Sequence, residues 1–165
     1  MARPSGLSIV EESSAEIVVH VAHVEARGRL NILPRWRKRV TWLSSKTSDV
    51  LALMVFVEPG FVSIREWEPD GPRVQRRFAE LLASTDADAR EAMRLIQDRF
   101  QKLVIPVGDR PSLGDAALAH LGLQVERGKK SIIYVAVSSD RIELMSQSYR
   151  DAKLIEGHPL IEDLP

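Results

Sequence analysis

The sequence predicts an α+β protein made of two similar halves with a pair of helices between them. Segments rich in β-branched residues, which favour strands, lie near both ends of the chain. The middle of the chain instead carries apolar residues at helical spacing. With 165 residues and 44% hydrophobic content, the chain is long enough to bury one core or two intimately packed halves.

In the first half, the expected order of elements is strand, strand, helix and hairpin. Pro34 suits the first turn of a helix, in which Trp36, Val40 and Leu43 share one face and the arginines lie on the other. A reverse turn is expected at residues 58–60, Glu-Pro-Gly. The predicted strands are 16–24, 29–33, 50–57 and 61–67, and the predicted helix is 35–43.

Two helices are expected in the middle of the chain. In residues 72–84, Val74, Phe78 and Leu81 recur at helical spacing. Thr85 and Asp88 form a capping pattern before a second helix, whose apolar face is formed by Ala89, Ala92, Met93 and Ile96.

The first pattern then returns, with a strand at 100–105, a helix at 113–121 and a hairpin at 131–137 and 141–145. We infer an internal duplication with about 73 residues between equivalent points. The predicted parts are a flexible N-terminus (1–14), a first half (15–70), a helical connection (71–97), a second half (98–152) and an acidic tail (153–165).

Charge is distributed unevenly, although the chain has 23 basic and 23 acidic residues. Seven basic residues and no acidic one lie between Arg27 and Ser48. From Asp140 to Pro165 there are six acidic and three basic residues. A clustered positive field attracts polyanions even when the whole molecule is neutral, so the basic segment is a candidate binding surface.

Several classes of protein are not indicated. The absence of cysteine excludes disulfides and thiol nucleophiles and fits a reducing cytoplasm. The N-terminus has the wrong charge order for a signal peptide, and the longest apolar run, 50–57, is too short to span a bilayer. Without a phosphate-binding glycine loop, a nucleophile elbow or a carboxylate–histidine cluster, we expect no enzyme, cofactor, metal or small-molecule substrate.

Several short motifs lie at the junctions between the expected elements. Residues 25–30, EARGRL, followed by Pro34 and Arg37, are similar to the DxxGR segment that opens each half of proteins in the MraZ branch of the AbrB-like (SpoVT-AbrB) family. Residues 98–106 form the second copy, with Gln101 for the glycine and Lys102 for the arginine. Residues 65–68 and 139–144 resemble segments of the two hairpins, and the resemblance covers most of residues 16–152.

The resemblance implies tandem swapped-hairpin halves that interleave in a pseudo-dimeric, β-barrel-like core. It also implies a DNA-binding transcriptional regulator in the cytoplasm, associated with the nucleoid, that forms a homo-oligomer and in some cases a ring. In the second copy an inserted segment, 107–112, precedes a helix without arginine. We therefore assign contact with double-stranded DNA mainly to the first half.

The candidate site combines a strand bend with a basic helix. Arg27 and Arg29 flank Gly28, where the missing side chain lets the backbone approach a partner closely. Arginine can hold phosphates or pair with guanine, and the following helix adds charge for the phosphate backbone. The predicted DNA-binding residues are Arg27, Arg29, Arg35, Arg37, Lys38 and Arg39, with Lys102 as a lesser candidate.

Other interpretations stay open. The basic helix face could simply be solvated, with Glu25 pairing with Arg29. An assembly or protein-interaction protein on the same fold is favoured by the altered second motif and the acidic tail. An antitoxin-like protein is favoured by the tail, 151–165, but two halves in one chain argue against it. The tryptophans, Trp36, Trp42 and Trp67, could stack on bases, although we interpret them as core or interface anchors.

Overall fold

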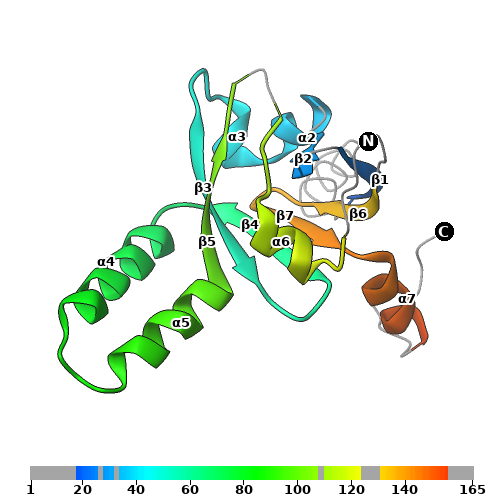
Figure 1. Cartoon of the computed structure of the whole chain (residues 1–165). Coiled ribbons are helices and arrows are strands. Elements are labelled where there is room, and N and C mark those ends of the chain that lie inside the picture. Colours follow the sequence, from blue (N-terminus) through cyan, green and yellow to red (C-terminus); the bar gives the residue numbers. More distant parts are fainter. Residues whose placement is uncertain (1–17, 26–27, 32–33, 108–109, 124–130, 156–165) are drawn as a thin grey trace, which may run out of the picture.

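The computed structural model describes residues 18–25, 28–31, 34–107, 110–123 and 131–155, which form a mixed α+β protein as predicted (Figure 1). The strands are β1 (Val18–Glu25), β2 (Arg29–Leu30), β3 (Val50–Phe56), β4 (Phe61–Glu66), β5 (Phe100–Ile105), β6 (Ser131–Val137) and β7 (Arg141–Met145). The helices are α2 (Pro34–Arg39), α3 (Thr41–Ser44), α4 (Asp70–Ala83), α5 (Ala89–Arg99), α6 (Asp115–His120) and α7 (Gln147–Ile155). The predicted N-terminal segment, 1–14, and residues 156–165 of the predicted tail lie outside the described residues.

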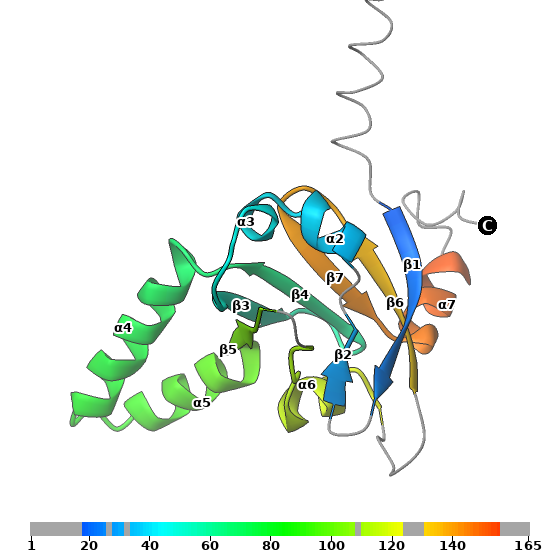
Figure 2. The same ribbon diagram turned by 90° about the horizontal axis from the view of Figure 1, so that it is seen from above.

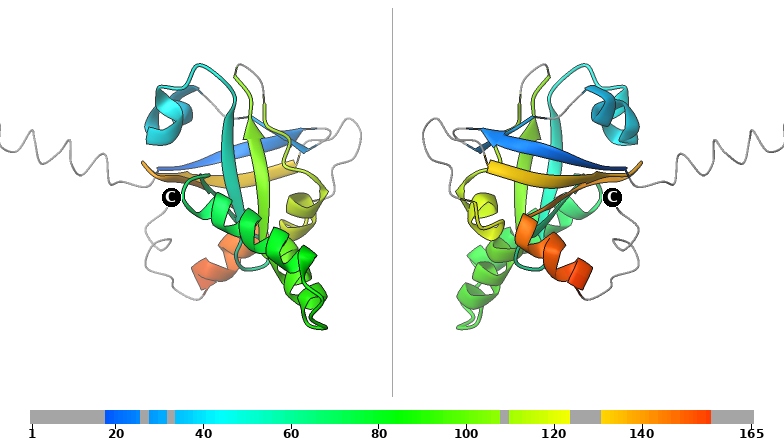
Figure 3. Two further views of the ribbon diagram at one scale, coloured as in Figure 1. Left: turned by 90° about the vertical axis from the view of Figure 1, so that its left-hand side faces the viewer. Right: turned by 90° about the vertical axis from the view of Figure 1, so that its right-hand side faces the viewer.

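The seven strands form one curled antiparallel sheet in the order β2-β1-β6-β7-β4-β3-β5. Because the sheet curls, β1 and β6 run across β3 and β5 (Figure 3). Alternate residues of each strand point into the curl and form the core, as in the pair Ile64 and Ile142 on β4 and β7, which are both fully buried. The other face of the sheet is outside the curl.

Helices α2, α3 and α6 pack against the core through buried side chains. Trp36, Leu43 and Ala117 are all buried in the same core as the inward-facing strand residues. The first half is also anchored on the second, because Thr41 N donates to Ser139 O (2.8 Å) and Trp42 Nε1 donates to Asp140 O (2.7 Å). The interpretation of Trp36 and Trp42 as core anchors is therefore confirmed.

Helices α4 and α5 form an antiparallel hairpin that projects from the sheet beside β3 and β5 (Figures 1 and 2). Helix α7 lies over the outer face of the sheet at β6, where the Arg150 guanidinium is 4.3 Å from the centre of the Tyr134 ring. No helix in the described part of the chain is long and apolar enough to cross a membrane.

Four details differ from the sequence-based expectations. The predicted helix 35–43 is broken at Val40, whose backbone is extended (φ −80°, ψ 114°), and the break allows Trp36 and Trp42 both to be buried. Within the described residues, the strand predicted at 29–33 is limited to β2. Asp88 makes no side-chain cap for α5; instead the Asp86 carboxylate accepts from Asp88 N (2.9 Å). Helix α7, which was not predicted, continues past the boundary predicted at residue 152.

The pairing of the strands is symmetric between the two halves. The first strand of each half pairs with the hairpin of the other half, β1 with β6 and β5 with β3, while β4 pairs with β7 at the centre. Val50 and Ser131, which begin β3 and β6, are 81 positions apart, and so are Pro34 and Asp115, which begin α2 and α6. The spacing between equivalent points is therefore 81 residues rather than the predicted 73, and β5 corresponds to β1, not to β2.

The central pair of strands provides a test of this packing. Ile64→Ala removes a fully buried side chain that faces Ile142, so we expect a loss of about 2–5 kcal/mol in the free energy of unfolding, measured by urea denaturation. Ile132→Ala is the matched control, because Ile132 on β6 is 49% exposed and should change stability by less than about 1 kcal/mol. Equal losses for the two variants would contradict the assignment of the inner face.

Candidate nucleic-acid interface

A short segment of the second half pairs with β2 and extends the sheet at that edge. Leu30 N donates to Pro111 O (2.9 Å), and Leu113 N donates to Gly28 O (3.0 Å). Arg29 and Ser112 stand opposite each other in an antiparallel bridge. The segment predicted to be an insertion, 107–112, therefore has a structural role, because its last residues pair with the first half.

Two arginines share the exposed face of this pairing. Leu30, Pro111 and Leu113 are buried, whereas Arg29 and Arg110 are exposed. Since side chains alternate along extended backbone, Arg29, Arg110 and Ser112 lie on one face, and the two arginines are diagonal neighbours about 7–8 Å apart at their α-carbons. We call residues 28–30 and 110–113 the arginine ribbon.

Glu25 contacts the second of these arginines. Its carboxylate accepts a hydrogen bond from Arg110 Nη1 and forms an ion pair with it. The alternative that Glu25 pairs with Arg29 is therefore corrected in favour of Arg110. Both side chains are partly exposed, so the ion pair contributes less than about 1 kcal/mol to stability, and its main effect is to orient Arg110.

Helix α2 follows the ribbon and carries the other predicted basic residues. Arg35 and Lys38 are exposed, as expected for side chains on the outer face. Arg37 and Arg39 are half-buried, and Arg37 Nη1 donates to Pro106 O (3.3 Å) at the end of β5. The expectation that all the arginines of this helix face away from the core is thus wrong for Arg37 and Arg39, because α2 packs against β5 through Arg37. Arg27 lies outside the described residues.

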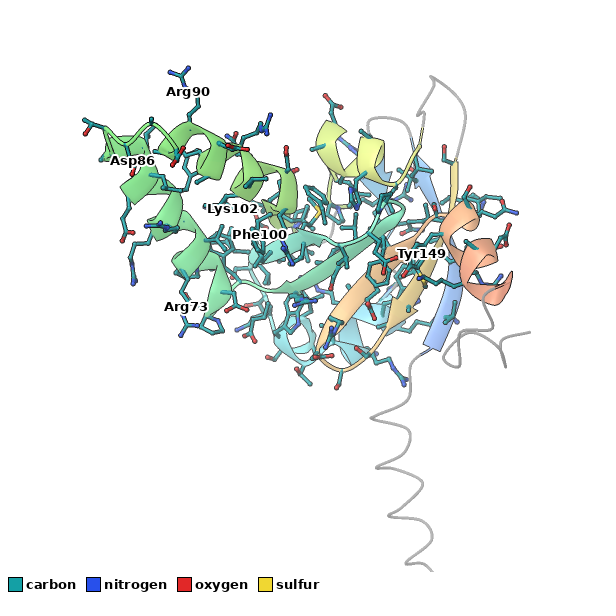
Figure 4. The ribbon with its side chains drawn as sticks, turned by 90° about the horizontal axis from the view of Figure 1, so that it is seen from below. Arg73, Asp86, Arg90, Phe100, Lys102 and Tyr149 are labelled. Carbon is teal, nitrogen blue, oxygen red and sulfur yellow. The ribbon has the colours of Figure 1, made fainter. Side chains whose placement is uncertain are left out.

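Lys102, the candidate from the second half, lies apart from the ribbon. It lines an apolar groove between the sheet and the α4–α5 hairpin, together with Phe78, Ile96 and Phe100 (Figure 4). Its ammonium group is 5.2 Å from the centre of the Trp67 ring. Arg29 on β2 and Lys102 on β5 therefore lie on the two outermost strands, at opposite ends of the strand order of the sheet.

Sequence reasoning missed Arg110 because the second motif was matched at the wrong spacing. A spacing of 73 residues relates Arg29 to Lys102, whereas the observed spacing of 81 relates Arg29 to Arg110. The correct spacing is indicated by the first residues of the equivalent elements, because β3 and β6, and likewise α2 and α6, begin 81 positions apart.

A second charged cluster lies in the middle of the sheet, outside the curl. Arg65 Nε donates to Ser63 Oγ (3.0 Å) on β4, and Glu143 stands opposite Ser63 on β7. Burial raises the pKa of Glu143, although the nearby guanidinium groups of Arg141 and Arg65 act to lower it. In the described part of the chain, no group of three or more histidine, cysteine or acidic residues could hold a metal ion.

No family model matches this chain, and no curated protein matches it significantly. The class of the protein therefore follows from its structure alone. It is a mixed α+β protein with a curled antiparallel sheet and an arginine-bearing ribbon at one edge.

The turn that holds Arg29 depends on Gly28. Its φ of +70° disfavours any other residue, and an added Cβ would lie 2.8 Å from Leu118 Cδ1 on α6. We expect Gly28→Ala to lower the free energy of unfolding by about 1 kcal/mol more than Gly122→Ala, because Gly122 has a similar φ of +69° but no atom within 4 Å of its added Cβ. Both losses would be measured by thermal and urea denaturation. A further Leu118→Ala change should remove the extra loss; equal losses for the two glycine variants would show that the Leu118 side chain moves aside at little cost.

Proposed function

We propose that this chain is a DNA-binding transcriptional regulator whose arginine ribbon and helix α2 contact double-stranded DNA. The observation that carries the proposal is that Arg29 and Arg110, from opposite halves of the chain, share the exposed face of a two-segment antiparallel ribbon. A ribbon of this kind fits the major groove of B-DNA, where a guanidinium can pair with guanine O6 and N7 or hold a phosphate.

Helix α2 supports the same proposal. Its first residue, Pro34, follows Leu30 by four positions, so it lies within about 14 Å of the ribbon. The exposed Arg35 and Lys38 can neutralise phosphates beside the bases that the ribbon would contact. The segment between Arg27 and Ser48 has no acidic residue, so it contributes a positive field beside the ribbon, of which Glu25, the ion-pair partner of Arg110, offsets a part.

We extend the proposal to the fold family, the location and the assembly. The resemblance of residues 25–30 to the MraZ motif, together with the pairing of each half's first strand with the other half's hairpin, supports a swapped-hairpin protein of the MraZ and AbrB kind. The same resemblance supports a homo-oligomer, which would multiply weak DNA contacts, and a place in the cytoplasm at the nucleoid.

The proposal is tested by fluorescence anisotropy with a labelled duplex from the chain's own upstream region, over a series of salt concentrations. The Arg29→Ala, Arg110→Ala variant should bind at least about 10-fold more weakly at 0.15 M salt. In a plot of log affinity against log salt concentration, the magnitude of its slope should fall by about two, since each lost phosphate contact lowers the slope by about 0.9.

The matched control is Arg76→Ala with Arg90→Ala, which removes the same charge from exposed positions of the α4–α5 hairpin. Circular dichroism and melting curves would establish that all variants are folded. Equal losses in the two double variants would show that only net charge matters. The proposal fails if the chain binds no duplex at low salt; a protein partner would then be sought for an assembly protein.

A further inference from the structure

We infer that the chain binds a DNA duplex asymmetrically: both halves supply an arginine to the ribbon, but only the first half supplies phosphate-neutralising charge beside it. This inference rests on the proposed function. It comes from comparing residues that the internal symmetry makes equivalent, namely those 81 positions apart in helices α2 and α6.

Helices α2 and α6 occupy equivalent places on the two sides of the ribbon. Both have six residues, and Figure 2 shows the two helices well apart, with β2 close to α6. Each packs against the other half: Arg37 of α2 donates to Pro106 O, and Leu118 of α6, the residue equivalent to Arg37, lies against Gly28. A duplex seated on the ribbon would therefore meet α2 on one side and α6 on the other.

The exposed faces of the two helices differ in charge. Arg35 and Lys38 of α2 correspond to Ala116 and Ala119 of α6, and all four residues are exposed. The first residue of α6, Asp115, adds an exposed acid where α2 has Pro34. Among the equivalent exposed positions, α2 thus offers two cations and α6 offers two methyl groups.

This difference predicts how a duplex would be held. The two phosphate strands that border a DNA groove are related by local two-fold axes, which is why symmetric proteins bind palindromic sites. If Arg29 and Arg110 straddle such an axis, α2 faces one strand and α6 the other. Counter-ion release would then come mainly from the strand beside α2. The preferred target is a duplex site whose two halves are not equivalent.

The test restores the missing charge. The Ala116→Arg, Ala119→Lys variant places the cations of α2 at the equivalent exposed positions of α6, and Arg and Lys are both good helix formers. We expect the magnitude of the slope of log affinity against log salt concentration to increase by about two. The affinity at 0.15 M salt should rise about 10-fold or more. The Arg35→Ala, Lys38→Ala variant should make the plot shallower by about the same amount.

Ala79→Arg with Ala83→Lys is the matched control, because it adds the same charge at exposed positions of α4. The inference is supported if the gain from α6 clearly exceeds the gain from α4. It is overturned, with the proposed function intact, if wild-type binding is salt-sensitive and the two added pairs have equal effects. Absence of wild-type binding at low salt would overturn both the inference and the proposed function.

Discussion

The backbone pairing of β4 with β7 joins the two halves into one sheet, and the rest of the structure depends on it. Ser63 stands opposite Glu143 at the centre of this pairing, and the other strands follow in the same order on either side. Each hairpin pairs beyond this centre with the first strand of the opposite half. Neither half therefore completes its part of the sheet alone, and the two should unfold together.

The same constraint creates the arginine ribbon. Arg29 and Ser112 are far apart in the sequence and become neighbours only because the sheet curls and brings the two halves together at that edge. The ribbon is held by a few backbone hydrogen bonds, by the buried Leu30 and Leu113, and by Gly28, whose backbone has a positive φ and lies close to the Leu118 side chain of α6. The position of the arginines is thus set by the core rather than by their own contacts.

Much of the fold could be predicted from the sequence, because strands and helices with strong periodicity are local features. The strands β3, β5, β6 and β7 lie within one residue of the expected ranges, and the helical connection is present as the α4–α5 hairpin. The break at Val40 could not be predicted, because it results from burying Trp36 and Trp42 together in the core. Helix α7 was missed because its apolar pattern is short and follows directly on β7.

The candidate site could be predicted only in part. Arg29, Arg35 and Lys38 are exposed near the edge of the sheet, as the sequence suggested. Arg37 is half-buried because it bonds to Pro106 in the other half, a contact that no local pattern encodes. Arg110 was missed because the repeat was matched through a short motif, whereas the true spacing is carried by the lengths and pairing of the strands.

We propose that the ribbon is the surface that contacts DNA. The most direct measurement is a titration of the ¹⁵N-labelled chain with a short duplex, followed residue by residue through its backbone amide signals. If the ribbon binds DNA, we expect the largest, salt-sensitive changes at Arg29, Leu30 and residues 110, 112 and 113, with smaller changes along α2. Changes confined to the α4–α5 hairpin, or no change at low salt, would contradict it.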